Sequence, residues 1–452
     1  MSTPQRLWDK GAPLEQLVHR FTVGDDPLID RELVHWDCLG SAAHARTLHR
    51  AGLLSDSDLA LLLAGLARID ALSAAGKFDI PPELEDCHTA IEAHLTRECG
   101  EAGGRIHTGR SRNDQVAVAM RLFMRHRALA WLELLHELGA ALLARIERDG
   151  GLPMPGYTHL QPAMPTTTGQ WLLAHAEGVL EQCRAALDLL SRLDSCPLGS
   201  GAGFGVSLPL DREYTARLLG FARAQRAVAD VQNSRGRLEL YFVRVGADAA
   251  AVLEKLSWDL VLFATAEFGF VALPEELTTG SSIMPQKRNP DALELLRAHA
   301  GRLRARQHEL EWVAGKLPSG YHRDLQLTKS PAVRTADDVA IMLRVATRLV
   351  SAFAWDADRL RAALRPELYA THAAYALVRQ GVPFREAYRR VGEQLRAGSL
   401  PLLSGADAAS TGDVTAALVA EARGELAELQ RRAREWSERC ARAERSVLEP
   451  AQ

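Results

Sequence analysis

The sequence has few cysteines and none of the spacings that mark a metal or cofactor site. Its six cysteines among 452 residues form no CxxC pair, so we expect reduced, buried side chains rather than a disulfide framework. The 15 histidines contain no HExxH. Four glycines, Gly199, Gly201, Gly203 and Gly205, alternate with other residues and do not follow the dinucleotide pattern GxGxxG. We therefore expect neither a bound metal nor a cofactor.

The sequence also lacks a large excess of charge and long hydrophobic runs. Lys and Arg number 54 and Asp and Glu 57, a net charge of −3, which gives no indication of a nucleic-acid or membrane-surface partner. No apolar run approaches the roughly 20 residues of a membrane-spanning helix. The first residues, with Arg6, Asp9 and Lys10, lack the apolar core of a signal peptide. We expect a cytoplasmic protein that binds a small molecule.

Long helical periodicities dominate the sequence after residue 111. Apolar residues recur at helical spacing up to Gly150, and further helices are predicted over residues 168–194, 231–267, 290–316 and 335–364. The helix at 290–316 carries a heptad seam interrupted at Gln307. Helices of this length usually pack as a bundle, and their seams can be shared with other copies of the chain.

Shorter helical segments flank this central part. The predicted organisation is a mainly α fold with a small helical domain over residues 1–110, a long-helix bundle over 111–364 and a second small helical domain over 365–452. The arginine-rich last helix is interpreted as a solvated face rather than a nucleic-acid site.

Residues 278–291, TTGSSIMPQKRNPD, form a polar stretch that leads into an amphipathic helix. Asn289 followed by Pro290 predicts an N-cap and a first helical residue. A helix N-terminus beside Lys287 suits an anion such as a carboxylate. We interpret the stretch as a catalytic lid; the alternative is a surface turn with an ordinary helix cap.

Two other polar stretches precede predicted helices. Residues 104–115, GRIHTGRSRNDQ, place three arginines at the start of the first long helix, and arginine binds carboxylates through its planar fork. Residues 154–165, MPGYTHLQPAMP, present His159, and histidine is a residue type suited to proton transfer. The alternatives are a capped, charged helix start and a structural histidine.

The order of residues in these stretches resembles the fumarase/aspartase superfamily, whose members eliminate across a carbon–carbon bond and release fumarate. GSSIMPQKRNP is similar to its signature loop, and YTHLQ to another of its motifs. The MPQK form and the string GRSRNDQ are most similar to the argininosuccinate lyase family. EDCHT at 85–89, LPSGYHRDLQ at 317–326 and GVPFR at 381–385 extend the resemblance over nearly the whole chain.

The resemblance implies a three-domain homotetramer whose active sites are shared between subunits. It implies reversible cleavage of argininosuccinate to arginine and fumarate without a cofactor. Ser281 would be the base and Lys287 would stabilise the aci-carboxylate intermediate. His159, oriented by Glu294, would protonate the leaving nitrogen. The substrate contacts that it implies are Ser111, Arg112, Asn113, Thr158, Asn289, Tyr321, Gln326, Lys329 and His88.

The sequence departs from the family pattern near its N-terminus. The usual WGGRF segment is absent, with LWDKG at residues 7–11 instead, and a family serine that contacts substrate has no clear counterpart. Gly24, Asp25 and Asp26 are therefore the expected place where a different amine would be recognised. Two alternatives stay open: a sister lyase acting on adenylosuccinate or another amine–succinate adduct, and a non-catalytic protein on the same scaffold, as among lens crystallins.

Overall fold

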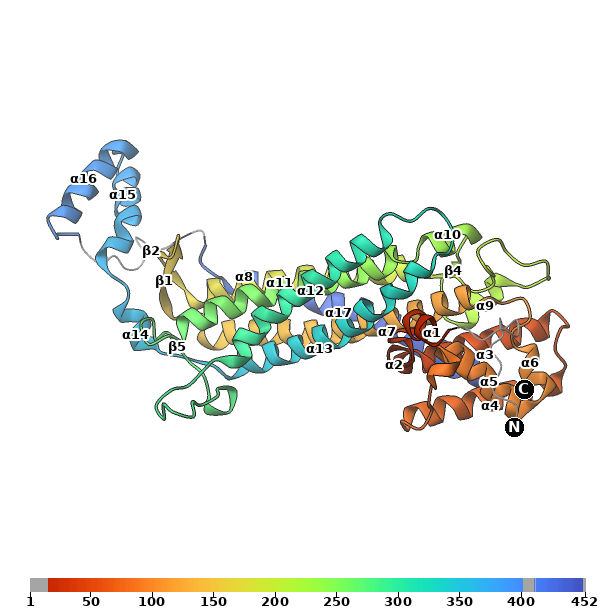
Figure 1. Cartoon of the computed structure of the whole chain (residues 1–452). Coiled ribbons are helices and arrows are strands. Elements are labelled where there is room, and N and C mark those ends of the chain that lie inside the picture. The colour runs from red at the N-terminus through yellow and green to blue at the C-terminus, as the bar shows by residue number, and fades with distance from the viewer. Residues whose placement is uncertain (1–14, 401–409, 411, 450–452) are drawn as a thin grey trace.

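The computed structural model describes residues 15–400, 410 and 412–449; the LWDKG segment at 7–11 lies outside them. Long helices run side by side and give the molecule an elongated shape (Figure 1). The bundle is built from α7 (Arg112–Asp149), α8 (Thr168–Leu193), α11 (Arg237–Phe263), α12 (Asp291–Ala314) and α13 (Lys329–Ala352). The predicted mainly α fold is confirmed.

The ends of α7 follow from local sequence signals. The Ser111 hydroxyl caps the helix, and the Asp114 carboxylate accepts the Ser111 N–H in return at 3.0 Å, which forms a capping box. The helix ends at Gly150, as predicted. Most of its apolar side chains are buried in the main core, so tertiary packing rather than the caps supplies most of its stability.

The heptad seam of α12 is confirmed as far as Leu310, because Leu293, Leu296, Ala300, Leu303 and Leu310 are all buried. The last two predicted members do not fit, since Ala314 is half-buried at the end of the helix and Leu317 lies beyond it. The prediction for the next helix was displaced. That helix, α13, begins at Lys329 and ends at Ala352, not at 335 and 364. Pro331 is tolerated in its first turn, and Phe353 leaves the helix in an extended conformation (φ −61°, ψ 151°) before strand β6.

The N-terminal part is a compact group of short and medium helices at one end of the bundle (Figure 1). Its elements are α1 (Gln16–Val23), α2 (Asp26–Ile29), η1 (Asp30–Glu32), α3 (Val34–Arg50), α4 (Asp56–Ala74), η2 (Pro82–Leu84), α5 (Cys87–Cys99) and α6 (Glu101–Arg105). The apolar faces of α3, α4 and α5 belong to the same core as the bundle helices, whereas α1 leaves Leu17, Val18 and Phe21 exposed. This part is therefore packed against the bundle.

Short strands and turns connect the bundle helices. The strands pair as β1 (Pro153–Thr158) with β2 (Gln161–Thr167), β3 (Ser195–Cys196) with β4 (Arg223–Ala224), and β5 (Val271–Ala272) with β6 (Ala354–Trp355). The remaining short elements are α9 (Arg212–Leu218), α10 (Val228–Asn233), η3 (Glu275–Leu277), η4 (Arg323–Thr328), α14 (Ala357–Ala362) and η5 (Pro366–Tyr369).

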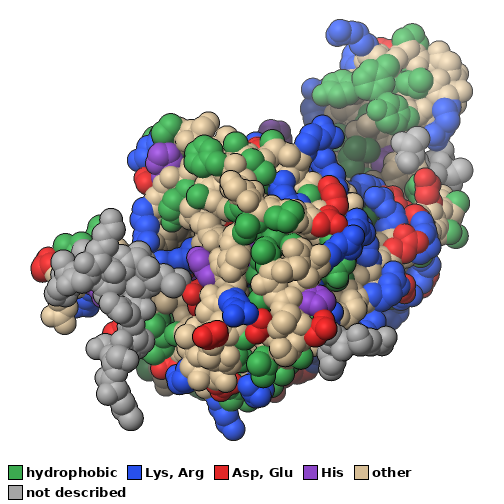
Figure 2. Space-filling view, turned by 90° about the vertical axis from the view of Figure 1, so that its right-hand side faces the viewer, with side chains coloured by type: hydrophobic (Ala, Val, Ile, Leu, Met, Phe, Trp, Pro, Cys, Tyr) green, Lys and Arg blue, Asp and Glu red, His purple; other side chains and the backbone are tan. Residues whose placement is uncertain are grey.

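The C-terminal part contains two different structures. Helices α15 (Ala370–Arg379) and α16 (Phe384–Arg396) share a small core of their own and project beyond the bundle with hydrophobic side chains on their surface (Figures 1 and 2). Helix α17 (Ala416–Leu448) returns along the bundle, and its apolar face joins the main core. The division into three domains at residues 110 and 364 stays a prediction. None of the described helices is long and apolar enough to span a membrane.

Candidate active site

The residues predicted to form the site fall into two groups at opposite ends of the bundle (Figure 1). Arg112 begins α7, whereas Thr158 and His159 follow its other end; the helix has 38 residues and is therefore roughly 57 Å long. Likewise, the 24 residues of α12 separate Lys287 and Asn289 from Tyr321 and Gln326, roughly 36 Å at the rise of an α-helix. One chain does not bring the two groups together.

The first group surrounds a hollow of about 180 Å³ beside the N-terminal helices. Six of the predicted substrate contacts line it, and they come from three distant segments, around residue 88, at 112–113 and at 321–329. The hollow is lined by Asp26, Asp86, His88, Arg112, Asn113, Val116, Arg235, Tyr321, Arg323, Gln326 and Lys329.

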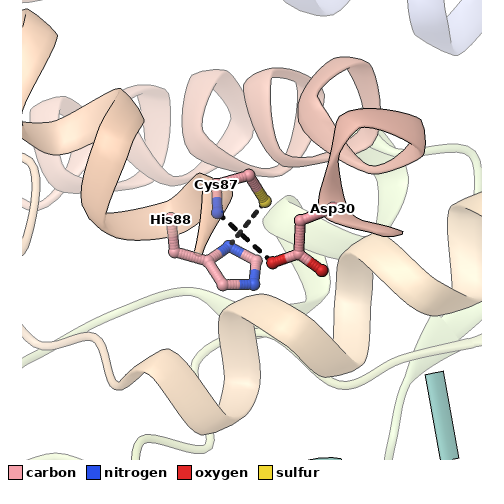
Figure 3. Close-up of side chains that lie close together, drawn as sticks. All are labelled: Asp30, Cys87 and His88. Atoms are coloured by element: carbon pink, nitrogen blue, oxygen red, sulfur yellow. Dashed lines mark hydrogen bonds between the residues drawn. The ribbon is translucent and has the colours of Figure 1, made fainter. Parts of the chain in front are cut away.

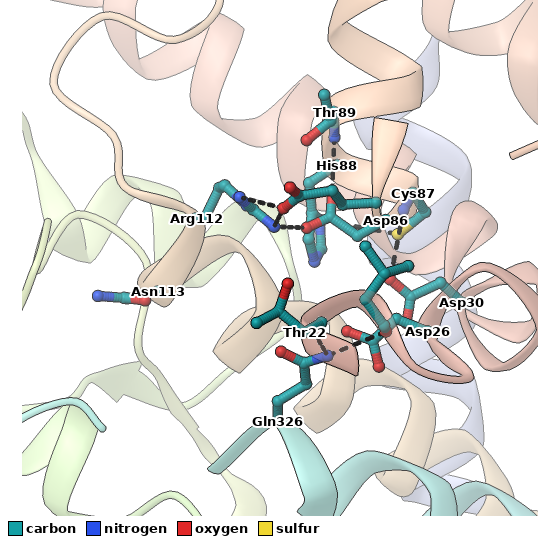
Figure 4. A network of polar contacts seen from close by, with 12 residues as sticks. Thr22, Asp26, Asp30, Asp86, Cys87, His88, Thr89, Arg112, Asn113 and Gln326 are labelled. Atoms are coloured by element: carbon teal, nitrogen blue, oxygen red, sulfur yellow. Dashed lines mark hydrogen bonds and ion pairs between the residues drawn. The ribbon is translucent and has the colours of Figure 1, made fainter. Parts of the chain in front are cut away.

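Arg112 is held by two acids of the 85–89 segment. Its guanidinium pairs with the carboxylates of Asp86 and, at 3.4 Å, of Glu85 (Figure 4). Burial would raise the pKa of Asp86, but His88 and Arg112 outweigh it and lower the pKa to about 2. Ser111 is occupied as the helix cap. Asn113, at the helix start, also lines the hollow, and its amide points away from the ion pairs.

Lys329 is a buried ammonium group shared by two carboxylates. Its Nζ lies 2.8 Å from Asp26 Oδ2 and 2.7 Å from Asp30 Oδ1. Burial would lower the pKa of Lys329, yet the two acids raise it, so the lysine stays charged. Burial raises the pKa of Asp26 to about 6, although Lys329 acts in the opposite direction. The Asp30 carboxylate, which competes for the same cation, adds to the increase. Asp26 belongs to the N-terminal segment that departs from the family pattern, and it also lines the hollow.

Gln326 and Arg323 attach the N-terminal segment to this end of the bundle. The Gln326 side-chain amide donates to the carbonyls of Thr22 at 3.0 Å and Val23 at 3.1 Å (Figure 4). The Arg323 guanidinium donates to the Thr22 carbonyl at 2.9 Å. These bonds fix the C-terminal end of α1 just before Asp26, so they help to position that carboxylate.

Asp30, Cys87 and His88 lie close enough together to suggest a metal site (Figure 3). Most of their donor atoms, however, already have partners; His88 Nε2 is the exception. Asp30 accepts the Cys87 N–H at 3.2 Å and pairs with Lys329, and His88 Nδ1 faces Asp37. Burial raises the pKa of the Cys87 thiol well above its usual value, which disfavours the thiolate that a metal needs. The cluster fits a network of ion pairs and hydrogen bonds better than a metal centre.

The alternating glycines form part of the support for the α7 start. The N–H groups of Gly199 and Gly201 donate to Asp114 Oδ2 at 3.1 and 2.8 Å. Both glycines have positive φ, a conformation that a side chain would strain. The loop therefore holds the end of α7 that carries Arg112 and Asn113.

The second group begins with the 278–291 loop, at the other end of the bundle. The Ser281 hydroxyl oxygen accepts the N–H groups of Ile283 at 3.4 Å and Met284 at 3.2 Å. Lys287 is exposed in a turn closed by its N–H and the Met284 carbonyl at 3.0 Å. The loop therefore presents a serine and a lysine to solvent, next to the start of α12.

One prediction for this loop was wrong: Asn289 is not the N-cap of α12. Pro290 occupies that position, and α12 begins at Asp291. Asn289 instead exchanges two backbone hydrogen bonds with Thr279, at 3.1 and 2.8 Å, and its amide donates to the Gly280 carbonyl at 3.3 Å. Asn289 therefore closes the loop through Thr279 and Gly280 and does not cap α12.

Thr158 and His159 lie at the tip of the β1–β2 hairpin. His159 and Leu160 form its two-residue turn with φ of 55° and 56°, the left-handed conformation that such hairpins require. Asn and Gly usually occupy these positions because other side chains are strained there. A histidine and a leucine in this turn, both exposed, indicate a role for the side chains beyond forming the turn.

Comparison with known proteins decides the family. A family model described as Lyase matches residues 17–304. The argininosuccinate lyase of Sorangium cellulosum (strain So ce56) is 45% identical over 393 residues, which cover 87% of this chain and 91% of that protein. The argininosuccinate lyase of Stenotrophomonas maltophilia (strain K279a) is 44% identical over 384 residues, 85% and 89% of the two chains. The chain belongs to the argininosuccinate lyase family.

Solved structures show how widely this fold is shared. EDDS lyase in complex with formate superimposes with a TM-score of 0.82 at 23% identity, over 96% of this chain and 95% of that one. A class II fumarase from Schistosoma mansoni gives 0.70 at 16% identity, over 86% and 93% of the chains. The chain thus has the mainly α, fumarase-like architecture that the motifs implied.

Within this member of the argininosuccinate lyase family, Glu294 lies exposed in the first turn of α12, where its carboxylate is 3.8 Å from Arg297. Its expected orientation of His159 stays a prediction. The sequence analysis did not single out Arg235, which lies between α10 and α11 and lines the hollow. No spacing in the sequence links it to Tyr321, although the two side chains meet in the fold.

The buried pair of His88 and Asp37 gives a prediction for stability against pH. His88 Nδ1 lies 3.0 Å from Asp37 Oδ2. Burial would lower the pKa of His88, but Asp37 and its acidic neighbours raise it above its usual 6.5. Burial would raise the pKa of Asp37 above its usual 3.8, but His88 lowers it. Both groups are therefore charged at pH values between the lowered pKa of Asp37 and the raised pKa of His88. Its stabilisation is lost as pH rises through the raised pKa of His88, and also as pH falls through the lowered pKa of Asp37.

We expect His88→Gln to reduce the free energy of unfolding by about 3 kcal/mol near pH 6, since it removes the cation that pairs directly with the buried Asp37. The difference from the unsubstituted protein should shrink as pH rises toward 9. Urea unfolding at several pH values measures it. A difference that stays constant from pH 6 to pH 9 would contradict a charged pair.

Proposed function

We propose that the chain catalyses the reversible elimination of argininosuccinate to L-arginine and fumarate, a reaction of arginine biosynthesis, without a cofactor. The observation that carries the proposal is that relatives 43–45% identical over 85–87% of this chain are named argininosuccinate lyase. The chain also retains Ser281, Lys287 and His159 in the matching motifs. We place the enzyme in the cytoplasm.

In this proposal Ser281 removes a proton from the substrate carbon next to a carboxylate. A serine hydroxyl is a poor base in water, so its alkoxide needs stabilisation. Two N–H groups that already point at the Ser281 oxygen, from Ile283 and Met284, support this role. Lys287 lies a few residues along the same loop and would offset the negative charge that develops on the carboxylate.

The carbon–nitrogen bond then breaks and its electron pair moves to the leaving nitrogen. His159, as a general acid, would protonate that nitrogen, with Glu294 orienting the imidazole. The exposed, strained hairpin tip supports a histidine that reaches outward to a substrate. Thr158 and Asn289 would contact the substrate at the same end, while Arg112, Asn113, Tyr321, Gln326, Lys329 and His88 would contribute from the hollow.

The active site is proposed to form between subunits of a homotetramer. The two groups of residues lie at opposite ends of α7 and α12 in one chain, so a complete site needs groups from different copies. Large apolar side chains remain exposed on the bundle helices, among them Trp258, Leu295, Trp312 and Ile341. Such side chains support packing of the bundle against other copies.

The test is fumarate release, followed by ultraviolet absorbance, with argininosuccinate, adenylosuccinate and aspartate as parallel substrates. We expect rapid release from argininosuccinate alone. Release from adenylosuccinate instead would indicate a sister lyase. No release from any substrate by a folded protein would indicate a non-catalytic member, which should also show no thermal stabilisation by fumarate.

A further inference from the structure

Arg235 is a buried cation without a carboxylate partner at the edge of the hollow. Only 7% of the residue is exposed. Its Nε has no hydrogen-bond partner, and one terminal nitrogen donates to the Leu325 carbonyl at a long 3.4 Å. Among residues 15–400, 410 and 412–449, no acid forms an ion pair with it. A buried, incompletely bonded guanidinium is costly unless something pairs with it.

Lys329, which is buried, and Arg112, which is half-buried, are already paired. Lys329 is shared by Asp26 and Asp30, and Arg112 is held by Asp86 and Glu85. Arg235 is therefore the buried cation of this hollow that can still accept an anion. Its planar fork is suited to a carboxylate.

Local structure fixes the position of Arg235. The next residue, Gly236, has a φ of +75°, and a Cβ there would lie 2.5 Å from the Ala314 Cβ. Only glycine fits both the conformation and the close approach to α12. The Arg235 guanidinium also lies over the Tyr321 ring, 5.6 Å from its centroid, within the range of a cation–π contact. Arg235 is thus placed before any ligand arrives.

We propose that Arg235 binds the α-carboxylate of the amino-acid end of the substrate, the end released as arginine. This assignment rests on the proposed function. Asp26 and Asp86 line the same hollow, and their carboxylate oxygens can accept hydrogen bonds from an ammonium group. An amino-acid end carries an ammonium group beside its carboxylate, so it can face both the acids and Arg235.

The experiment compares L-arginine with agmatine, which is arginine without its carboxylate, by calorimetric titration of the assembled protein. We expect arginine to bind the unsubstituted protein about tenfold or more tighter, the range for a hydrogen-bonded charged group. In Arg235→Gln the ratio should fall toward one, because arginine weakens while agmatine does not. Arg235→Lys, which keeps the charge but not the fork, should give an intermediate ratio.

Arg125→Gln is the matched control. Arg125 is also buried, donates to one carbonyl, that of Leu219, at 2.9 Å and lies over the Phe221 ring. Its loss should lower the melting temperature and leave the ratio unchanged. A ratio that persists in Arg235→Gln, or the loss of both ligands from the folded variant, would overturn the proposal. Failure of the proposed function would look different, because the unsubstituted protein would then release no fumarate from argininosuccinate.

Discussion

Replacing Ser281 with alanine is expected to lower turnover by about 10² to 10⁴-fold, the range for loss of a general base. Stability should hardly change. The Ser281 hydroxyl accepts only the local N–H groups of Ile283 and Met284 at 3.2 Å or more, in a loop that is otherwise exposed. Surface changes of this kind usually cost less than about 0.5 kcal/mol. Steady-state fumarate release and thermal unfolding, at one protein concentration, measure the two effects.

Ser282→Ala is the control for this experiment, since it removes the neighbouring exposed hydroxyl from the same loop. It should keep turnover within a few-fold of the unsubstituted protein. Equal losses in both variants would show that the loop, rather than the Ser281 hydroxyl, is needed. A large fall in melting temperature for Ser281→Ala would assign the residue a structural role.

Replacing Lys329 with methionine is expected to cost about 3–5 kcal/mol of unfolding free energy, because it leaves the half-buried Asp26 and the buried Asp30 without their cation. Asp30 has no exposed surface and cannot turn to solvent. Urea unfolding near pH 7.5 measures the loss. Lys316→Met, at an exposed lysine just after α12, should change the free energy by less than about 0.5 kcal/mol.

A second substitution tests the cause of that loss. In the Lys329→Met background, Asp26→Asn should recover part of the stability, because it removes one of the two unpaired charges. A cost for Lys329→Met below about 1 kcal/mol would mean that the two acids take up protons without penalty. Absence of any recovery in the double variant would show that packing, and not charge, sets the cost.

The sequence predicted the elements with strong local signals. Periodicity gave the bundle helices, the α12 seam and the α7 end at Gly150, because these depend on residues a few positions apart. The prediction that Asn289 is the N-cap of α12 was wrong. In the structure Asn289 forms backbone hydrogen bonds with Thr279 that close the loop, and these compete with the cap position. The displaced C-terminal end of α13 reflects Phe353, whose extended conformation no periodicity could indicate.

The spacing of residues in the sequence could not predict contacts between distant segments. Lys329 meets Asp30 across 299 positions of sequence, and Arg235 meets Tyr321 only because Gly236 lets α11 approach α12 closely. The motifs did predict that Arg112, Asn113, Tyr321, Gln326 and Lys329 belong to one site. They could not show that Lys329 would form ion pairs with two acids, or that Arg235 would form none with the acids of the described residues.

The central claim is that groups from different subunits complete each active site. Its most direct test mixes Ser281→Ala and His159→Ala proteins, each inactive alone, and refolds them together. Both substitutions lie at the same end of one chain, but the two residues would serve one site from different subunits, so some sites in a mixed tetramer would contain neither substitution. We predict recovery of about a quarter of the activity or less, as random mixing allows. Mixed tetramers, verified by mass, that release no fumarate would contradict the claim.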